Sequence, residues 1–182
     1  MRALVARRLN GPAAAELIDT PIPVPAAGQV RIKVAAAAVN PVDVATTDGT
    51  LIDYNLSAPR EQFGIGWDVA GTVDAVGPGA DLPVGTAVIG VADLLGRPLK
   101  THAEYVVLNA SAVAPAPAGL ELAAASTFGL NALTAHQALD ALALSARQTL
   151  LVTGAAGGVG GYAVELGKHR GLTVIATAGE DD

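Results

Sequence analysis

The sequence predicts two successive architectures, an α+β region rich in strands over residues 1–118 and an α/β region over residues 119–182. Three observations lead to this fold class. Short apolar stretches separated by Gly and Pro recur through the first part, which is typical of a barrel or sandwich. The connector APAPAG at residues 114–119 then marks a change in the composition and periodicity of the sequence. After it, helix-forming residues lead into two continuous apolar runs on either side of a glycine-rich turn.

The composition excludes several classes of protein. Hydrophobic residues make up 51% of the 182 residues, which is enough to bury a core and excludes disorder as a global description. The absence of cysteine excludes disulfides, thiolate zinc sites and a cysteine nucleophile. The net charge of −6 comes without a basic stripe, so no nucleic-acid partner is expected. No uninterrupted apolar stretch reaches the roughly 18 residues of a membrane span, and no signal peptide is evident, so a cytoplasmic protein is expected.

Period-two alternation identifies the strands of the first region. In QVRIKV, at residues 29–34, Val30, Ile32 and Val34 share one face, as in a half-buried strand. Similar stretches predict further strands at residues 3–8, 68–76, 86–91 and 104–109.

The second region predicts one β-α-β unit over residues 149–178. The runs TLLVTG (149–154) and LTVIATA (172–178) are typical of parallel strands buried on both faces, and the helix between them ends before Gly171. A complete nucleotide-binding sheet needs about five or six strands. We therefore expect that the chain is part of a longer protein, or that another chain supplies the rest.

The turn between the first of these strands and the helix carries the strongest chemical signal. Its glycines have the spacing G-x-x-G-x-x-G, and small residues there let a pyrophosphate approach the N-terminal N–H groups of the helix. The residues expected to contact the cofactor are Gly154, Ala156, Gly157, Gly158, Val159 and Gly160. The alternative is a tight turn whose small residues serve packing alone.

The end of the second strand bears on the choice of cofactor. A carboxylate at this place binds the ribose 2′-hydroxyl of NAD. Here the strand ends at Ala178 and Gly179, which leave room for a 2′-phosphate, so NADPH is the expected cofactor. The carboxylates of residues 180–182 would repel that phosphate if they pointed inward.

Five motifs in order resemble the medium-chain dehydrogenase/reductase superfamily, and most of all its zinc-free, zeta-crystallin-like quinone oxidoreductases. They are AVNPVD (38–43), WDVAGTVDAVG (67–77), HAEYV (102–106), LTAHQAL (133–139) and LLVTGAAGGVG (150–160). The resemblance implies a GroES-like substrate domain followed by the first β-α-β unit of an incomplete Rossmann domain. It also implies an NADPH-dependent oxidoreductase that transfers hydride to a quinone or an α,β-unsaturated carbonyl, and a homodimer at full length.

The same resemblance bears on metal binding. Zinc-dependent relatives carry Cys at the position of Asn40 and a His-Glu pair at the positions of Trp67 and Asp68. Asparagine and tryptophan are poor zinc ligands, so no metal site is expected and hydrogen bonds must polarise the substrate carbonyl instead.

Four further residues have two interpretations each. The resemblance places Asn40 at the substrate cleft, to contact a carbonyl or the nicotinamide ribose, whereas an Asn-Pro turn is the alternative. Asp43 would orient a ribose or anchor the loop, or else cap the short helix that follows, and capping is the expected role. Tyr54 would donate a proton or stack on the substrate, or else lie on the surface. Thr134 would bond the nicotinamide carboxamide, or its own helix backbone.

Two other functions stay open at this point. An enoyl reductase acting on acyl thioesters shares the same motifs. A non-catalytic, truncated binding or scaffold module is the alternative from a different class of protein.

Overall fold

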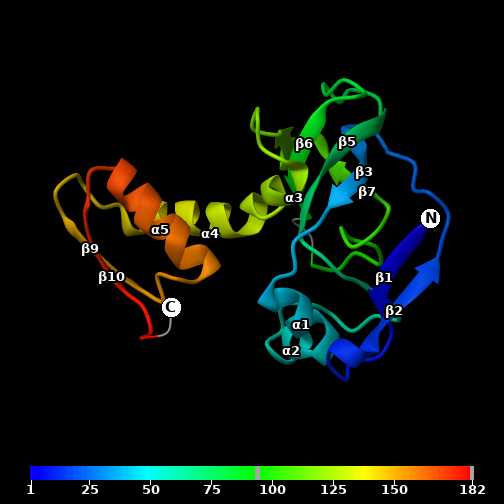
Figure 1. Ribbon diagram of the computed structural model, residues 1–182. Coiled ribbons are helices and arrows are strands. Elements are labelled where there is room, and N and C mark those ends of the chain that lie inside the picture. Colours follow the sequence, from blue (N-terminus) through cyan, green and yellow to red (C-terminus); the bar gives the residue numbers. More distant parts are fainter. Residues whose placement is uncertain (93–94, 181–182) are drawn as a thin grey trace. The chain divides into compact units, whose positions relative to one another are not determined.

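The computed structural model describes residues 1–92 and 95–180, which form two compact units (Figure 1). The first unit comprises Met1–Thr127 and the second Phe128–Asp182. The sequence places its boundary earlier, after residue 118. The short helix α3 (Leu122–Ala125) contacts strands of the first unit, which accounts for the later division.

A five-stranded antiparallel sheet with the order β7-β3-β5-β6-β8 dominates the first unit. Its strands are β3 (Gln29–Ala36), β5 (Asp68–Val76), β6 (Ala87–Val91), β7 (Tyr105–Asn109) and β8 (Val113–Pro115). Val30 and Ile32 are fully buried, and Val73, Val88 and Leu108 complete the core of the sheet. The alternation in residues 29–34 thus correctly predicts a strand with one buried face.

A smaller antiparallel sheet in the same unit has the order β2-β1-β4. It consists of β1 (Arg2–Ala6), β2 (Ala15–Asp19) and β4 (Phe63–Gly64), with a 3-10 turn at Pro12–Ala14 before β2. Of these strands the sequence predicts only β1. β2 is an edge strand without a buried residue. No face of it needs apolar side chains at every second position, and its sequence shows no clear alternation of apolar and polar residues.

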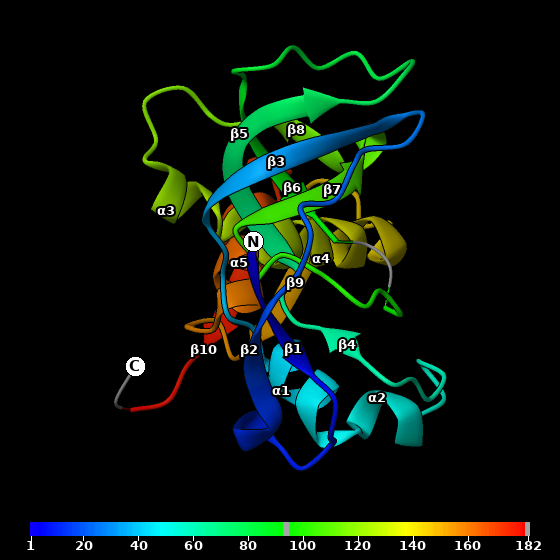
Figure 2. The ribbon, with the colours of Figure 1, turned by 90° about the vertical axis from the view of Figure 1, so that its right-hand side faces the viewer.

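Two short helices lie beside this smaller sheet, away from the larger one (Figure 2). They are α1 (Pro41–Asp48) and α2 (Thr50–Asp53). Gly49 separates them with a φ of 91°, a left-handed conformation that glycine adopts without steric cost.

The second unit contains the predicted β-α-β unit. A long helix, α4 (Phe128–Leu142), precedes β9 (Thr149–Thr153), α5 (Gly158–His169) and β10 (Thr173–Thr177). β9 and β10 pair in parallel, with Leu150 opposite Val174, which confirms the expected arrangement.

The prediction that both strands are buried on both faces is wrong. Leu150 and Val152 are buried against residues of α4 and α5, whereas Leu151 and Ile175 are more than half exposed. Two strands carry helices on one face only, so the other face lies open in the described part of the chain.

No helix among the described residues has both the length and the apolar character needed to cross a bilayer.

Candidate functional site

The glycine-rich turn of the second unit joins β9 to α5 through a left-handed residue. Gly154 has a φ of 64°, and the N–H of Gly157 donates to its carbonyl oxygen over 3.1 Å. The N–H of Ala155 donates to the carbonyl oxygen of Thr177 at the end of β10, over 2.9 Å. The turn is therefore tied to both strands of the unit.

Close packing explains the third glycine of the motif. A Cβ atom on Gly160 would overlap the carbonyl oxygen of Gly154, whereas one on Gly161 would lie 3.7 Å from the nearest atom, an ordinary contact. Gly160 is thus needed for the closure of the turn, which agrees with the packing interpretation of the motif as well as with the cofactor interpretation.

The N-terminus of α5 is open to a ligand. Gly157 is its N-cap and, having no side chain, forms no side-chain capping bond, while the Asn131 side chain of α4 lies close to Gly158. Gly157, Gly158 and Val159 are exposed. A hollow of about 390 Å³ lies beside them, lined by Phe128, Gly157, Gly158, Gly161, Tyr162 and Glu165.

Other residues predicted for the cofactor lie in this unit. Ala156, beside the glycines, is exposed. Ala178 and Gly179 follow β10 directly and are exposed, as is Glu180. Thr134 lies on the exposed side of α4. Asp181 and Asp182 are outside the described residues.

In the first unit, Asn40 is the N-cap of α1 and forms a capping box with Asp43. The backbone N–H of Asn40 donates to Asp43 Oδ2 over 2.8 Å, and the Asn40 side chain accepts from the Asp43 backbone. This is the local turn chemistry that the sequence leaves open as an alternative. Asp43 lies within the helix at position N3, and its other oxygen accepts the N–H of Gly66 over 2.9 Å.

A second bond ties Asn40 to the WDVAG segment. Its Nδ2 donates to Asp68 Oδ2 over 2.7 Å, and the exposed fraction is only 5% for Asn40 and 0% for Asp68. The structure thus brings Asn40 together with Asp68, at the positions where zinc-dependent relatives are expected to hold ligands.

A buried lysine completes this polar cluster, and the sequence gives no signal for it. Lys100 is 2% exposed, and its Nζ lies 3.4 Å from the centroid of the Trp67 ring. Such a contact stabilises a desolvated ammonium group through the ring electrons. Lys100 precedes the HAEYV motif, in a stretch without regular periodicity, so neither spacing nor alternation could identify it.

Two buried polar atoms in the cluster have no hydrogen-bond partner among the described residues. They are the indole Nε1 of Trp67 and the hydroxyl of Thr101. The Thr101 hydroxyl packs against Gly66, where a Cβ atom would overlap it. A buried donor without a partner costs about 1–3 kcal/mol, so the two atoms lower the stability of this cluster.

Tyr54 lies apart from the buried cluster. It is the C-cap of α2 and is 73% exposed, so its ring and hydroxyl are accessible.

A small hollow of about 160 Å³ flanks the start of α1. Its walls are mostly apolar and include residues on both sides of Asn40 in sequence. They comprise Leu4, Pro12, Ala15, Val39, Asp43, Val44, Thr47, Ile65 and His102.

Within residues 1–92 and 95–180, no group of three or more His, Asp or Glu side chains is arranged to hold a metal ion.

Comparisons with known proteins bear on the family. Residues 26–118 match the alcohol dehydrogenase GroES-like domain family. The quinone oxidoreductase of Sus scrofa is 35% identical over 185 residues, an alignment that covers the whole chain and 54% of that protein. The chain thus spans about half the length of the curated relatives it matches.

Solved structures agree with this assignment. An alcohol dehydrogenase superfamily protein from Novosphingobium aromaticivorans has a TM-score of 0.90 and 36% identity, over 100% of this chain and 54% of that one. The CurK enoyl reductase has a TM-score of 0.88 and 28% identity, over 99% and 55%. The mycobacterial protein Rv1454c complexed with NADPH has a TM-score of 0.83 and 30% identity, over 100% and 54%.

The GroES-like domain match and the alignment of the whole chain with about half the length of the quinone oxidoreductases confirm the resemblance seen in the motifs. The chain therefore belongs to the alcohol dehydrogenase GroES-like domain family, within the medium-chain dehydrogenase/reductase superfamily.

Proposed function

We propose that the protein acts as an NADPH-dependent oxidoreductase that transfers hydride to a quinone or an α,β-unsaturated carbonyl without zinc. The observation that carries the proposal is the glycine turn before α5, whose residues Gly157, Gly158 and Val159 are exposed and whose N-cap has no side chain. Such a helix N-terminus suits an anionic diphosphate. Relatives named quinone oxidoreductases support the reaction class.

The residues of the turn would hold the cofactor. In this proposal the backbone of Gly154, Ala156, Gly157, Gly158, Val159 and Gly160 lies against the pyrophosphate. Ala178 and Gly179 leave space for the 2′-phosphate, and Thr134 contacts the carboxamide. When bound, the nicotinamide supplies the hydride, and the protein supplies binding and orientation. The relative solved with NADPH supports this choice of cofactor.

The polar cluster of the first unit supports the zinc-free part of the proposal. The Asn40 amide donates to Asp68, whereas a zinc ligand would have to present a lone pair to the metal. A buried ammonium group, that of Lys100, already lies over the neighbouring Trp67 ring. A nearby second cation would raise the electrostatic cost of the cluster.

Asn40 and Tyr54 are the proposed catalytic residues. Asn40 would contact a substrate carbonyl or the nicotinamide ribose, and its bonds to Asp43 and Asp68 fix the orientation of its amide. Tyr54 would donate a proton or a hydrogen bond, and its exposure leaves the hydroxyl accessible. The apolar hollow beside Asn40 suits the ring or alkenyl part of a small-molecule substrate. A cytoplasmic homodimer at full length belongs to the same proposal.

Cofactor titration is the direct test. Adding NADPH or NADH to the chain and following nicotinamide fluorescence should show tighter binding of NADPH. Gly157→Val should abolish binding and leave the far-UV circular dichroism unchanged, because the φ of Gly157 is −75° and suits any residue. Equal affinity for the two cofactors would reject the NADPH assignment, and NADPH-dependent quinone reduction that EDTA abolishes would reject the zinc-free mechanism.

A second candidate is an enoyl reductase acting on acyl thioesters, because the CurK enoyl reductase shares this fold over nearly the whole chain. Comparing NADPH oxidation with 1,4-benzoquinone and with crotonyl thioester separates the two. Faster turnover of the thioester would favour the second candidate.

A further inference from the structure

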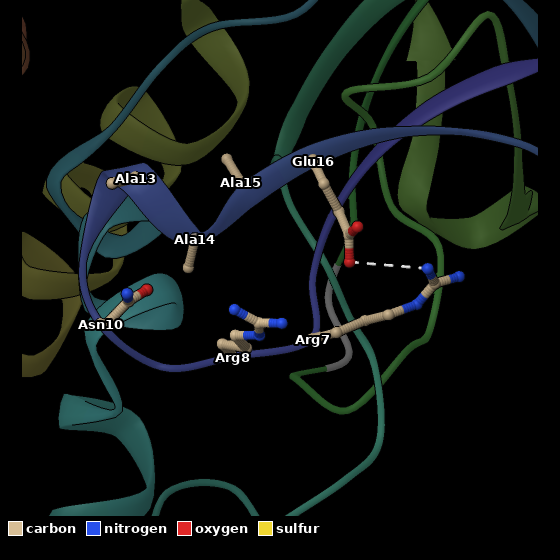
Figure 3. A pocket seen from close by; sticks show the side chains of 7 residues that line it. All are labelled: Arg7, Arg8, Asn10, Ala13, Ala14, Ala15 and Glu16. Carbon is tan, nitrogen blue, oxygen red and sulfur yellow. Dashed lines mark ion pairs between the residues drawn. The ribbon is translucent and has the colours of Figure 1, made fainter.

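A second hollow, of about 480 Å³, lies within the connection between β1 and β2 (Figure 3). Its polar wall consists of Arg7, Arg8, Asn10 and Glu16, and its apolar wall of the alanines at 13–15. The connection is anchored, because the N–H of Gly11 donates to the carbonyl oxygen of Thr47 in α1 over 3.1 Å. Ala15 also lines the smaller hollow beside α1, whereas the charged and amide side chains of this hollow belong to no part of the proposed redox site.

The charges around the hollow are unequal. Arg7 lies 3.5 Å from the carboxylate of Glu16, and its Nε donates to Gln62 over 3.2 Å. Arg8 has no ion pair within the described part of the chain, and its guanidinium points into the hollow in Figure 3. One positive charge is therefore left uncompensated, and Glu16 disfavours a ligand with two negative charges.

The chemistry of the walls identifies a ligand class. A planar guanidinium binds a carboxylate through two parallel hydrogen bonds, and the amide of Asn10 offers a further donor. The volume suits a small organic molecule better than a bare ion, and the Ala14 side chain, which points toward Arg8 in Figure 3, offers an apolar surface. We propose that the hollow binds a small organic monocarboxylate, with its carboxylate on Arg8 and Asn10 and its apolar part against Ala13 and Ala14.

Hexanoate is a suitable probe for this site. In ¹H–¹⁵N spectra of the chain, hexanoate should shift the amide signals of residues 7–16. Hexanamide has the same length without the charge, and acetate has the charge without the body, so both should bind more weakly. Arg8→Gln should weaken hexanoate binding about tenfold, because it removes a charge-assisted hydrogen bond.

The matched control is Arg147→Gln, which removes an exposed arginine from the second unit. It should leave hexanoate affinity unchanged, and unshifted signals elsewhere in Arg8→Gln will show that the fold is intact. Equal effects of the two substitutions, equal affinity for hexanoate and hexanamide, or no shift in residues 7–16 would each overturn the proposal. NADPH titration of the same samples tests the redox proposal separately.

Discussion

The Asn40 side chain links two segments of the first unit, since it caps α1 and donates to the buried carboxylate of Asp68. Its burial makes both bonds important for folding. A cap contributes about 1 kcal/mol, and a buried carboxylate that loses a donor costs more.

Asn40→Ala should therefore lower the free energy of unfolding by about 2–3 kcal/mol, as measured by urea denaturation followed through Trp67 fluorescence. Asn10→Ala is the matched control at an exposed asparagine and should change stability by less than about 0.5 kcal/mol. Similar losses in the two variants would show that the cap and the Asp68 bond contribute little.

Hydrogen bonds from Arg2 lower the pKa of the Glu104 carboxyl group. The backbone N–H of Arg2 donates to it over 2.8 Å and the guanidinium over 3.0–3.1 Å, and together they hold its pKa below the usual 4.5. A lowered folded-state pKa stabilises the protein above the unfolded pKa, and that stabilisation is lost as the pH falls through the folded value.

We expect the stability difference between the wild type and Glu104→Gln to be largest above pH 4.5 and to shrink on acidification below it. A ¹³C titration of the Glu104 carboxyl group gives the pKa directly. Arg2→Gln should restore only part of the shift, because the backbone N–H, which is the larger cause, remains. A pKa at or above 4.5 in the wild type would contradict the assignment.

At the scale of elements, the strand-turn-helix of the second unit depends on Gly160. A Cβ atom added to Gly160 would overlap the backbone of Gly154. That backbone cannot move aside as a flexible side chain could. Gly161, one residue later in α5, has the space for a methyl group.

Gly160→Ala and Gly161→Ala form a matched pair. Gly160→Ala should destabilise the second unit by about 1–3 kcal/mol and weaken NADPH binding. Gly161→Ala should keep NADPH binding and raise stability by up to about 1 kcal/mol, since alanine favours a helix over glycine. Thermal unfolding and cofactor titration of both variants test this, and equal behaviour would show that the close approach is unimportant.

Strands with one well-buried face, such as β3 and β7, are predicted correctly from the sequence. The same reasoning misses β2, because an exposed edge strand has no alternation to detect. At the site, the glycine spacing predicts the turn because it reflects a backbone constraint. Lys100 is different: its burial over Trp67 depends on tertiary contacts that no local pattern records.

At the scale of the whole molecule, each unit has its own core. In the first unit, eight described residues form a buried cluster on the larger sheet, including Ile32 and Leu108, and all are at most 4% exposed. The buried cluster of the second unit has four described residues, and three of them, Leu150, Val152 and Leu172, are 7–8% exposed. Burial of apolar surface is the main source of stability, so the second unit should be the weaker one.

Two separate thermal transitions should result. The single tryptophan, Trp67, reports only on the first unit, whereas far-UV circular dichroism reports on both. We expect the dichroism to change before the fluorescence does. Leu150→Ala should lower only the first transition and Ile32→Ala only the second, and coincident transitions in the wild type would show that the units unfold together.

The bend at Gly154 has a consequence for chirality. Its φ of 64° lies in open space, with no neighbouring atom near the position of a Cβ. This geometry is the mirror image of the one that an L-residue prefers. A chemically synthesised chain with D-alanine at this position should therefore retain the bend, whereas L-alanine should strain it. Handedness, and not bulk, favours the one achiral amino acid at this position, although Ala143 and Arg147 show that L-residues of this chain also adopt a positive φ.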